Sequence, residues 1–128
     1  NEMSEKNNNR IKVLFVCSAN LQRSKTGEDY FSSITDEYIF QSAGTNLKIC
    51  AKEGTNPITE ELVIWADIIL VMETKHASII NNHTQEKYHN KIVVLDIPDI
   101  YKYYQNELIS ILKERVTPHF ENLSKNDD

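Results

Sequence analysis

The sequence predicts an α/β fold, a three-layer sandwich in which a four-stranded parallel sheet is flanked by helices on both faces. Four short apolar runs rich in β-branched residues alternate along the chain with segments of helical period. These runs are apolar at nearly every position, which is typical of parallel strands that are covered on both faces. The expected strands are residues 11–16, 38–41, 67–72 and 91–95.

Four helices are expected between and after these strands. The first carries Tyr30, Phe31 and Ile34 on its inward side, and the last carries apolar residues at core spacing. Thr59 opens the second helix, because its side chain suits the N-cap position. The expected helices cover residues 24–33, 59–65, 74–82 and 104–116.

The connecting segments are expected to be irregular. Residues 42–45 form a turn in which Gly44 suits a backbone with positive φ. Residues 46–57 show no clear period and end in Pro57, so they are expected to form a loop.

Length and composition limit the class of protein. A chain of 128 residues fits one domain, which we place at residues 11–120, between a disordered N-terminal segment at 1–10 and a polar tail at 121–128. No apolar run approaches the roughly 20 residues that span a membrane, and the first ten residues contain no signal-peptide pattern. We therefore expect a cytoplasmic protein with no membrane partner.

Charge and metal-ligating residues exclude further classes. The net charge is −5 and the basic residues are scattered, which argues against a nucleic-acid partner. The two cysteines form no Cys-x-x-Cys pair or Cys/His cluster, so neither a metal site nor a cofactor is expected. All four histidines lie in polar surroundings and are expected on the surface; they are His76, His83, His89 and His119.

Residues 17–24 form the segment whose pattern indicates chemistry. Cys17 ends the first strand, and Arg23 follows after five residues, where the first helix begins. Such a loop can turn successive backbone N–H groups inward as an anion nest, beside the positive end of the helix. Arg23 adds a planar fork for two phosphate oxygens, and the same field favours the nucleophilic thiolate form of Cys17. The loop comprises Cys17, Ser18, Ala19, Asn20, Leu21, Gln22, Arg23 and Ser24.

The spacing by itself also fits an ordinary buried cysteine followed by a surface arginine. Its position between a strand and a helix favours the functional interpretation, in which the loop binds phosphate or another oxyanion. For Asp99 the residues alone favour the simpler interpretation, in which Asp99 and Asp96 only solvate a turn around Pro98.

The segment VLFVCSANLQRS, residues 13–24, resembles the active-site signature of low-molecular-weight protein tyrosine phosphatases. Three later stretches agree in the same order: SAGT at 42–45, ADIILVME at 66–73 and LDIPDIY at 95–101. The resemblance covers about residues 11–116 and is to the short bacterial members of the family. It implies an enzyme that hydrolyses a phosphorylated protein or a small phosphomonoester through a phosphocysteine intermediate.

The resemblance also implies a role for each matching residue. Cys17 matches the nucleophile, Arg23 the phosphate-binding arginine and Asp99 the general acid. The remaining matches support the loop or form one aromatic wall of the pocket; they are Asn20, Ser24 and Ser42 for the loop and Tyr101 for the wall.

Several residues depart from the family's pattern. Ala19 stands where the family usually has glycine, Gln22 replaces a second loop cysteine, and Lys25 replaces a proline at the start of the helix. Lys48 stands near the usual position of a tryptophan that forms the second pocket wall, within a shortened segment. With Tyr101 as the one remaining wall, we expect weak activity on phosphotyrosine peptides.

Three alternatives share the fold or the loop. A thioredoxin-coupled arsenate reductase needs two further cysteines, and residues 66–90 contain none. A phosphocysteine carrier of sugar phosphotransfer does not use the arginine at position 23. The third alternative is a pseudo-phosphatase that only binds a phosphorylated partner. Nothing in the sequence requires this interpretation, because every reacting residue is present. Cys50 is expected to be an ordinary thiol rather than a redox partner of Cys17.

Overall fold

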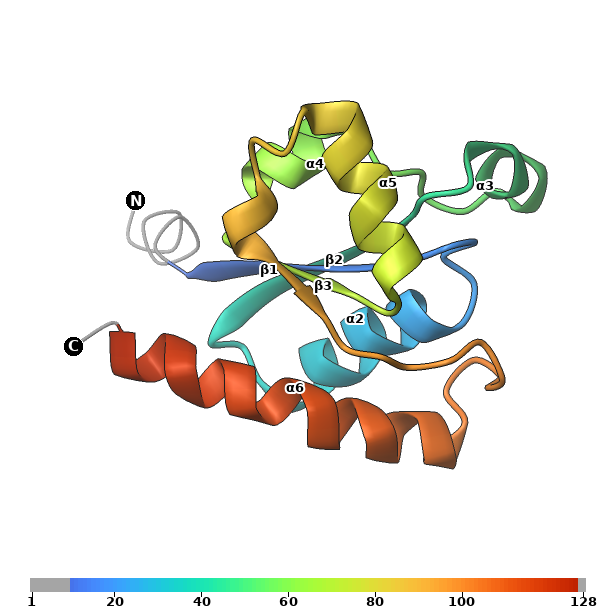
Figure 1. Ribbon diagram of the computed structural model, residues 1–128. Coiled ribbons are helices and arrows are strands. Elements are labelled where there is room, and N and C mark those ends of the chain that lie inside the picture. Colours follow the sequence, from blue (N-terminus) through green and yellow to red (C-terminus); the bar gives the residue numbers. More distant parts are fainter. Residues whose placement is uncertain (1–9, 127–128) are drawn as a thin grey trace, which may run out of the picture.

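The computed structural model describes residues 10–126, and its centre is a sheet of four parallel strands (Figure 1). The strands lie in the order β2-β1-β3-β4, so the predicted four-stranded parallel sheet is confirmed. The N-terminal segment that was expected to be disordered falls, apart from Arg10, outside the described residues. The strands are β1 (Ile11–Cys17), β2 (Tyr38–Gly44), β3 (Ile68–Val71) and β4 (Ile92–Val94).

Helices cover both faces of the sheet, as the sequence predicts. In Figure 1, α2 and α6 lie on one face, α4 and α5 lie on the other, and α3 lies beyond the carboxyl ends of the strands. Thr59 caps α4 as expected, since its hydroxyl accepts a hydrogen bond from the Leu62 N–H. The helices are α2 (Arg23–Ile34), α3 (Leu47–Glu53), α4 (Glu60–Trp65), α5 (Thr74–Thr84) and α6 (Asn106–Asn126), with a 3₁₀ turn η1 (His89–Lys91) before β4.

Strand β1 is the centre of the core because it is buried on both faces. Val13 and Phe15 belong to the apolar cluster beneath α2 and α6, and Leu14 and Val16 belong to the cluster beneath α4 and α5. This alternation follows from the period of two in a β-strand. From α2, Phe31 stacks on Phe15, whereas Ile34, predicted to face inward, is 57% exposed at the end of the helix.

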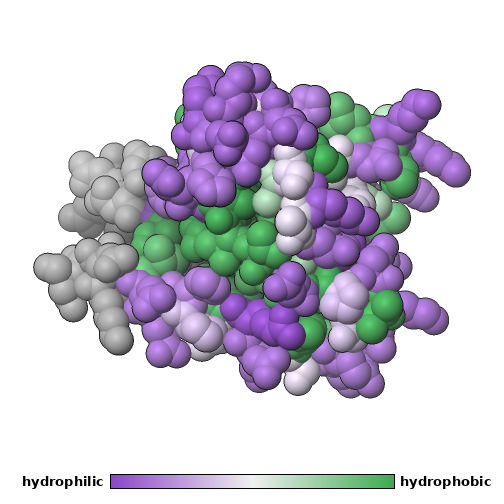
Figure 2. All heavy atoms as spheres, viewed as in Figure 1, coloured by the Kyte–Doolittle hydropathy of each residue, from purple (hydrophilic) through white to green (hydrophobic). Residues whose placement is uncertain are grey.

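The edge of the sheet at β4 is partly open. Figure 2 shows apolar residues gathered between the two helical layers, in the region where Figure 1 places β4. All three β4 residues are only half-buried. The strand is very short, which limits the backbone that this edge offers to another chain. Within residues 10–126, no helix combines the length and apolarity needed to cross a membrane.

The segment at 46–57, predicted to be a loop, contains the helix α3. The Asn46 side chain accepts a hydrogen bond from the Ile49 N–H at the start of this helix, and Gly54 ends it with a left-handed φ of 72°. α3 has only seven residues, and Cys50 is the one that is buried. So short a helix shows almost no apolar period, which is why its pattern is not visible in the sequence.

Helix α6 is longer than predicted, and residues 121–126 of the expected polar tail belong to it. Pro118 lies inside the helix, where its missing N–H removes one intrahelical hydrogen bond. Phe120 and Leu123 nevertheless pack against the apolar cluster beneath α2 and α6. The Phe120 ring stacks on Tyr38 with centroids 4.6 Å apart, so tertiary packing overrides the proline.

Gly44 is required by close packing rather than by positive φ, which corrects the prediction made for the turn at 42–45. Gly54 is the glycine with positive φ among the described residues. A Cβ atom added to Gly44 would lie 2.6 Å from both the Cys50 sulfur and the Ser18 carbonyl oxygen. The backbone here holds the 17–24 loop directly, because the Thr45 and Asn46 N–H groups donate to the carbonyls of Cys17 and Ser18.

We expect the variant Gly44→Ala to lose roughly 1–3 kcal/mol of unfolding free energy, the usual effect of overpacking. Urea denaturation measures this loss. The control is Gly54→Asn, because no atom lies within 4 Å of a Cβ there and asparagine tolerates left-handed backbone. Equal stability of Gly44→Ala and the wild type would contradict the close approach.

Candidate active site

The candidate site lies where the carboxyl ends of the four strands meet. The chain leaves β1 toward β2 at one edge of the sheet, and it leaves β3 toward β4 at the other. In open α/β sheets, ligands bind at such a reversal of strand order, outside the carboxyl ends of the strands. The 17–24 loop follows β1 at this point, and the first turn of α5 follows the neighbouring β3.

Hydrogen bonds hold the sulfur of Cys17 and organise the loop around it. Cys17 is 3% exposed, and its Sγ lies 3.0 Å from the Ser24 Oγ. The Asn20 amide donates to the Oγ atoms of both Ser24 and Ser42, at 2.9 Å each. Because Ser24 accepts from Asn20, its own hydrogen is available to the sulfur. Asn20 adopts a left-handed φ of 57°, which asparagine tolerates better than most residues.

Two residues that the sequence does not single out complete this network. The Asn56 backbone N–H donates to the Asn20 Oδ1 at 3.1 Å, which fixes the orientation of the Asn20 amide. The Asn56 side chain also donates to the Ser42 carbonyl, and the Ser42 hydroxyl donates to Glu28. The loop is therefore braced from β2, from α2 and from the segment after α3.

Arg23 is 2% exposed and is held by the ends of two other strands. Its Nη1 donates to the Glu73 Oε2 at 2.5 Å, beyond β3, and to the Ile97 carbonyl at 2.8 Å, beyond β4. Its Nε lies 3.7 Å from the Asp99 Oδ1. The hydrogen bond from Arg23 lowers the pKa of Glu73, so this carboxylate stays charged and paired.

The 17–24 loop presents hydrogen-bond donors to a small cavity. Within residues 10–126, no protein acceptor receives a hydrogen bond from the backbone N–H groups of residues 18 to 22. Successive free N–H groups beside the N-terminus of α2 form a concave site for an anion. The cavity has a volume of about 110 Å³ and is lined by Cys17, Ser18, Ala19, Leu21, Gln22, Arg23, Ile49 and Asp99.

The walls of the cavity differ from those predicted. Ile49 of α3 lines it, and Lys48 does not. Tyr101, the predicted aromatic wall, packs against the apolar cluster beneath α2 and α6 and is not among the lining residues. Leu21 and Ile49 are 40% and 38% exposed, so the mouth of the cavity has an apolar rim.

The structure separates the two candidate carboxylates. Asp99 lines the cavity and its side chain is 61% exposed, so it is accessible to a ligand and to water. Asp96 lines a different hollow with Glu73 and Lys75, and its backbone is left-handed. Among the described residues, no cluster of three His, Cys, Asp or Glu side chains is arranged to hold a metal ion.

Comparison with known proteins identifies the fold. No protein-family model and no curated protein sequence matches the chain. Among solved structures, Vibrio vulnificus Wzb in complex with benzylphosphonate matches with a TM-score of 0.70 and 23% identity, over 88% of this chain and 98% of that one. The low-molecular-weight protein tyrosine phosphatase SP-PTP from Streptococcus pyogenes matches with a TM-score of 0.65 and 20% identity, over 90% of this chain and 92% of that one. This chain has the low-molecular-weight protein tyrosine phosphatase fold.

The same fold also serves phosphatases of another specificity. The YwlE arginine phosphatase from Geobacillus stearothermophilus matches with a TM-score of 0.65 and 18% identity, over 92% of this chain and 97% of that one. The low-molecular-weight phosphatase fold therefore does not by itself determine the substrate.

His76 contradicts the prediction that all four histidines lie on the surface, because it is fully buried. Its Nδ1 accepts the Glu73 backbone N–H at 3.0 Å, so its Nε2 carries the hydrogen and donates to the Ser18 Oγ at 2.9 Å. Burial lowers the pKa of His76 to about 4, which keeps the ring neutral. The signal in the sequence is the three-residue spacing from Glu73, since these two residues form a capping box at the start of α5.

The buried histidine predicts an acid-dependent loss of stability. Its pKa rises from about 4 in the folded state to about 6.5 in the unfolded chain. The unfolded state therefore binds the proton first, and folding stability falls as the pH drops from about 6.5 to about 4. The contribution is on the order of 3 kcal/mol and saturates below that range.

Urea denaturation of the wild type and of His76→Asn between pH 7 and pH 4 isolates this contribution. Asparagine does not titrate, so the two curves of unfolding free energy should converge as the pH falls. Curves that stay parallel over this range would show that His76 does not titrate with the shifted pKa.

Proposed function

We propose that this chain is a cysteine-dependent phosphatase that hydrolyses phosphomonoesters through a phosphocysteine intermediate. The observation that supports it most is the shared cavity, in which Cys17, Arg23 and Asp99 line one space beside the donor-rich 17–24 loop. A nucleophile, an anion-binding group and an acid meet there, as phosphoryl transfer requires. A cytoplasmic site of action belongs to the proposal, because the Cys17 thiolate must stay reduced.

In the first step, the free N–H groups of the loop and the Arg23 guanidinium bind the phosphoryl oxygens. The Cys17 thiolate attacks phosphorus, the S–P bond forms and the P–O ester bond breaks. Asp99 donates its proton to the departing oxygen, which would otherwise leave as an unstable anion. The Ser24 hydroxyl stabilises the thiolate before attack by donating to the sulfur.

In the second step, water attacks the phosphocysteine while Asp99, now a carboxylate, accepts a proton from it. The S–P bond breaks, the thiolate returns and inorganic phosphate leaves. The position of Asp99 supports both roles, because its exposed carboxylate reaches the cavity and solvent together.

The rim of the cavity favours an aryl phosphate, including phosphotyrosine. Leu21 and Ile49 offer apolar surface beside Cys17, which suits an aromatic ring. A phosphorylated guanidino group, the substrate class of an arginine phosphatase, is polar, and neither Leu21 nor Ile49 offers an acceptor to its N–H groups. The expectation of weak peptide activity rests on Tyr101 as one wall and on Lys48 in place of the second. Neither residue lines the cavity, and Leu21 and Ile49 supply the apolar contact instead.

Cys17→Ser should abolish turnover of p-nitrophenyl phosphate, since a serine hydroxyl is not ionised in this site. Arg23→Lys should lower kcat/KM at least about a hundredfold, because a point charge cannot replace the guanidinium fork. Steady-state kinetics measures both. Cys50→Ser is the matched control, and near-normal activity of Cys17→Ser would eliminate the mechanism.

Asp99→Asn should slow hydrolysis most for esters with poor leaving groups, which need the proton. The decisive measurement is kcat/KM across a series of aryl phosphates with increasing leaving-group pKa. The wild type should depend weakly on leaving-group pKa, and Asp99→Asn should depend on it steeply. Asp96→Asn is the control, and equal slopes for Asp99→Asn and the wild type would rule out Asp99 as the acid.

A further inference from the structure

A second hollow adjoins the cavity over Cys17. Ser18 lines both spaces, so they meet at the residue that follows the nucleophile. The second hollow, of about 500 Å³, is much larger than the first. Its lining comes from the 17–24 loop, from the start of α3 and from α5; the residues are Ser18, Thr45, Asn46, Leu47, Lys48, Lys75 and Ile79.

The charge of this lysine hollow, as we call it, is positive although the chain carries a net charge of −5. Lys48 and Lys75 enter the lining from α3 and α5, and none of the lining residues is acidic. Glu73 lies 3.9 Å from the Lys75 Nζ but is bonded to Arg23 and lies outside the lining. Among the described residues, none forms an ion pair with Lys48. Lys48 is therefore available to an anion, and Lys75, whose side chain is 61% exposed and only distantly paired with Glu73, can also meet one.

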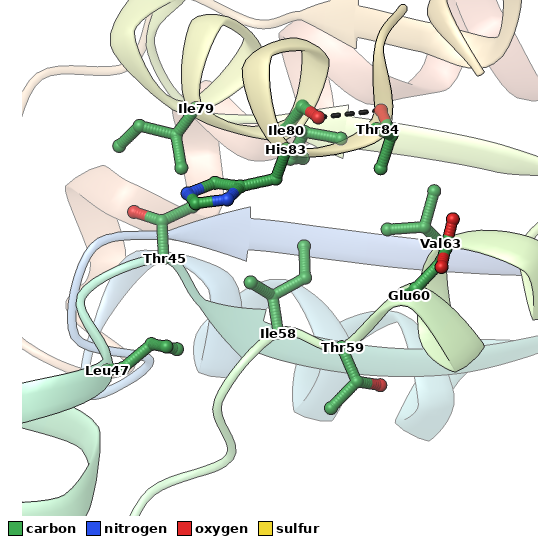
Figure 3. Close-up of a pocket in the computed structure, with 10 residues that line it drawn as sticks. All are labelled: Thr45, Leu47, Ile58, Thr59, Glu60, Val63, Ile79, Ile80, His83 and Thr84. Atoms are coloured by element: carbon green, nitrogen blue, oxygen red, sulfur yellow. Dashed lines mark hydrogen bonds between the residues drawn. The ribbon is translucent and has the colours of Figure 1, made fainter. Parts of the chain in front are cut away.

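An apolar groove adjoins the lysine hollow, and Figure 3 shows the residues that line this groove. The two spaces share Thr45, Leu47 and Ile79. In Figure 3, Ile58 lies on one side of the groove, and Ile79 and Ile80 lie on the other. The groove has a volume of about 260 Å³, enough for an apolar side chain. Three spaces thus follow one another: a donor-rich cavity, a cationic hollow and an apolar groove.

We propose that the lysine hollow and the apolar groove bind the segment next to the phosphorylated residue of a phosphopeptide. An acidic side chain pairs with Lys48 and Lys75, and an apolar side chain farther along enters the groove. The inference rests on the proposed function in placing the phosphoryl group over Cys17. A peptide fits because an extended chain advances about 3.3 Å per residue and presents side chains to successive pockets. A small ester occupies the first cavity alone.

Matched phosphotyrosine peptides test this proposal through kcat/KM. One has alanine at all flanking positions, and the others carry glutamate near the phosphotyrosine and leucine farther on, placed on the N-terminal or the C-terminal side. We expect one of these orientations to exceed the alanine peptide by roughly three- to tenfold, the combined effect of two exposed ion pairs and one apolar contact. Lysine in place of glutamate should lower kcat/KM below the alanine value.

Variants show which residues cause the preference for the acidic peptide. The preference is measured as the ratio of kcat/KM between two peptides, so any change in basal activity cancels. Lys48→Glu and Lys75→Glu should each reduce the preference for the acidic peptide, and the double variant should abolish it. Lys52→Glu makes the same charge change on α3 outside the hollow and should keep the wild-type ratio. Leu47→Ser should remove the preference for leucine, and Ile64→Ser should not, although both parent residues are 58% exposed.

Binding separates failure of this proposal from failure of the proposed function. If neither p-nitrophenyl phosphate nor any peptide is hydrolysed, the phosphatase proposal fails. The subsite would still be supported if the Cys17→Ser variant bound fluorescent phosphopeptides with a flanking glutamate more tightly than those with alanine. Equal kcat/KM for acidic, alanine and lysine peptides would overturn the subsite and leave the phosphatase standing.

Two other occupants give distinct results, and each would overturn the proposal. A small ester with two phosphate groups would show a lysine-dependent advantage that acidic peptides lack. A second copy of this chain in the groove would give a dimer in analytical ultracentrifugation that Leu47→Ser dissociates, with no effect on peptide preference.

Discussion

The burial of Arg23 is the constraint on which the rest of the site depends. A guanidinium that is only 2% exposed must be paired, because an unpaired buried charge is strongly destabilising. Glu73 provides the charge and the Ile97 carbonyl provides a further acceptor, from beyond β3 and β4. Arg23 itself begins α2, directly after the loop that follows β1. One side chain thus links the ends of three strands, and the 17–24 loop has its shape before any ligand arrives.

Hydrogen bonds at the start of α5 connect Arg23 to the other side of the 17–24 loop. Glu73 binds Arg23 through its carboxylate, and its backbone N–H is bonded to His76. His76 then reaches Ser18, which lines both the cavity and the lysine hollow. Hydrogen-bond donors that are already in place stabilise a negative charge more strongly than donors that must first reorganise. The neutral state of His76 matters here, since a protonated ring could not accept the Glu73 N–H.

The sequence revealed the sheet and the loop because their patterns are local. The four apolar runs specify parallel strands, and the Cys17 and Arg23 spacing lies within one strand-to-helix connection. It did not reveal Asn56 or His76, whose partners lie 36 and 58 residues away in the chain. The residues that line the cavity also differ from the expected walls, because a seven-residue helix decides whether Ile49 or Lys48 faces the cavity. Such choices are made by tertiary packing, which a single sequence does not display.

The position of the site at the ends of parallel strands has a consequence for folding. The residues of the site span from Cys17 to Asp99. Each pair of neighbouring strands in this parallel sheet is separated along the chain by at least one helix. Contacts of long sequence separation form late, because the chain must first lose loop entropy. No fragment that lacks β1, β3 or the segment after β4 can assemble the cavity. The donor-lined cavity beside Cys17 is therefore a cooperative property of the whole fold, and a partly folded chain lacks it.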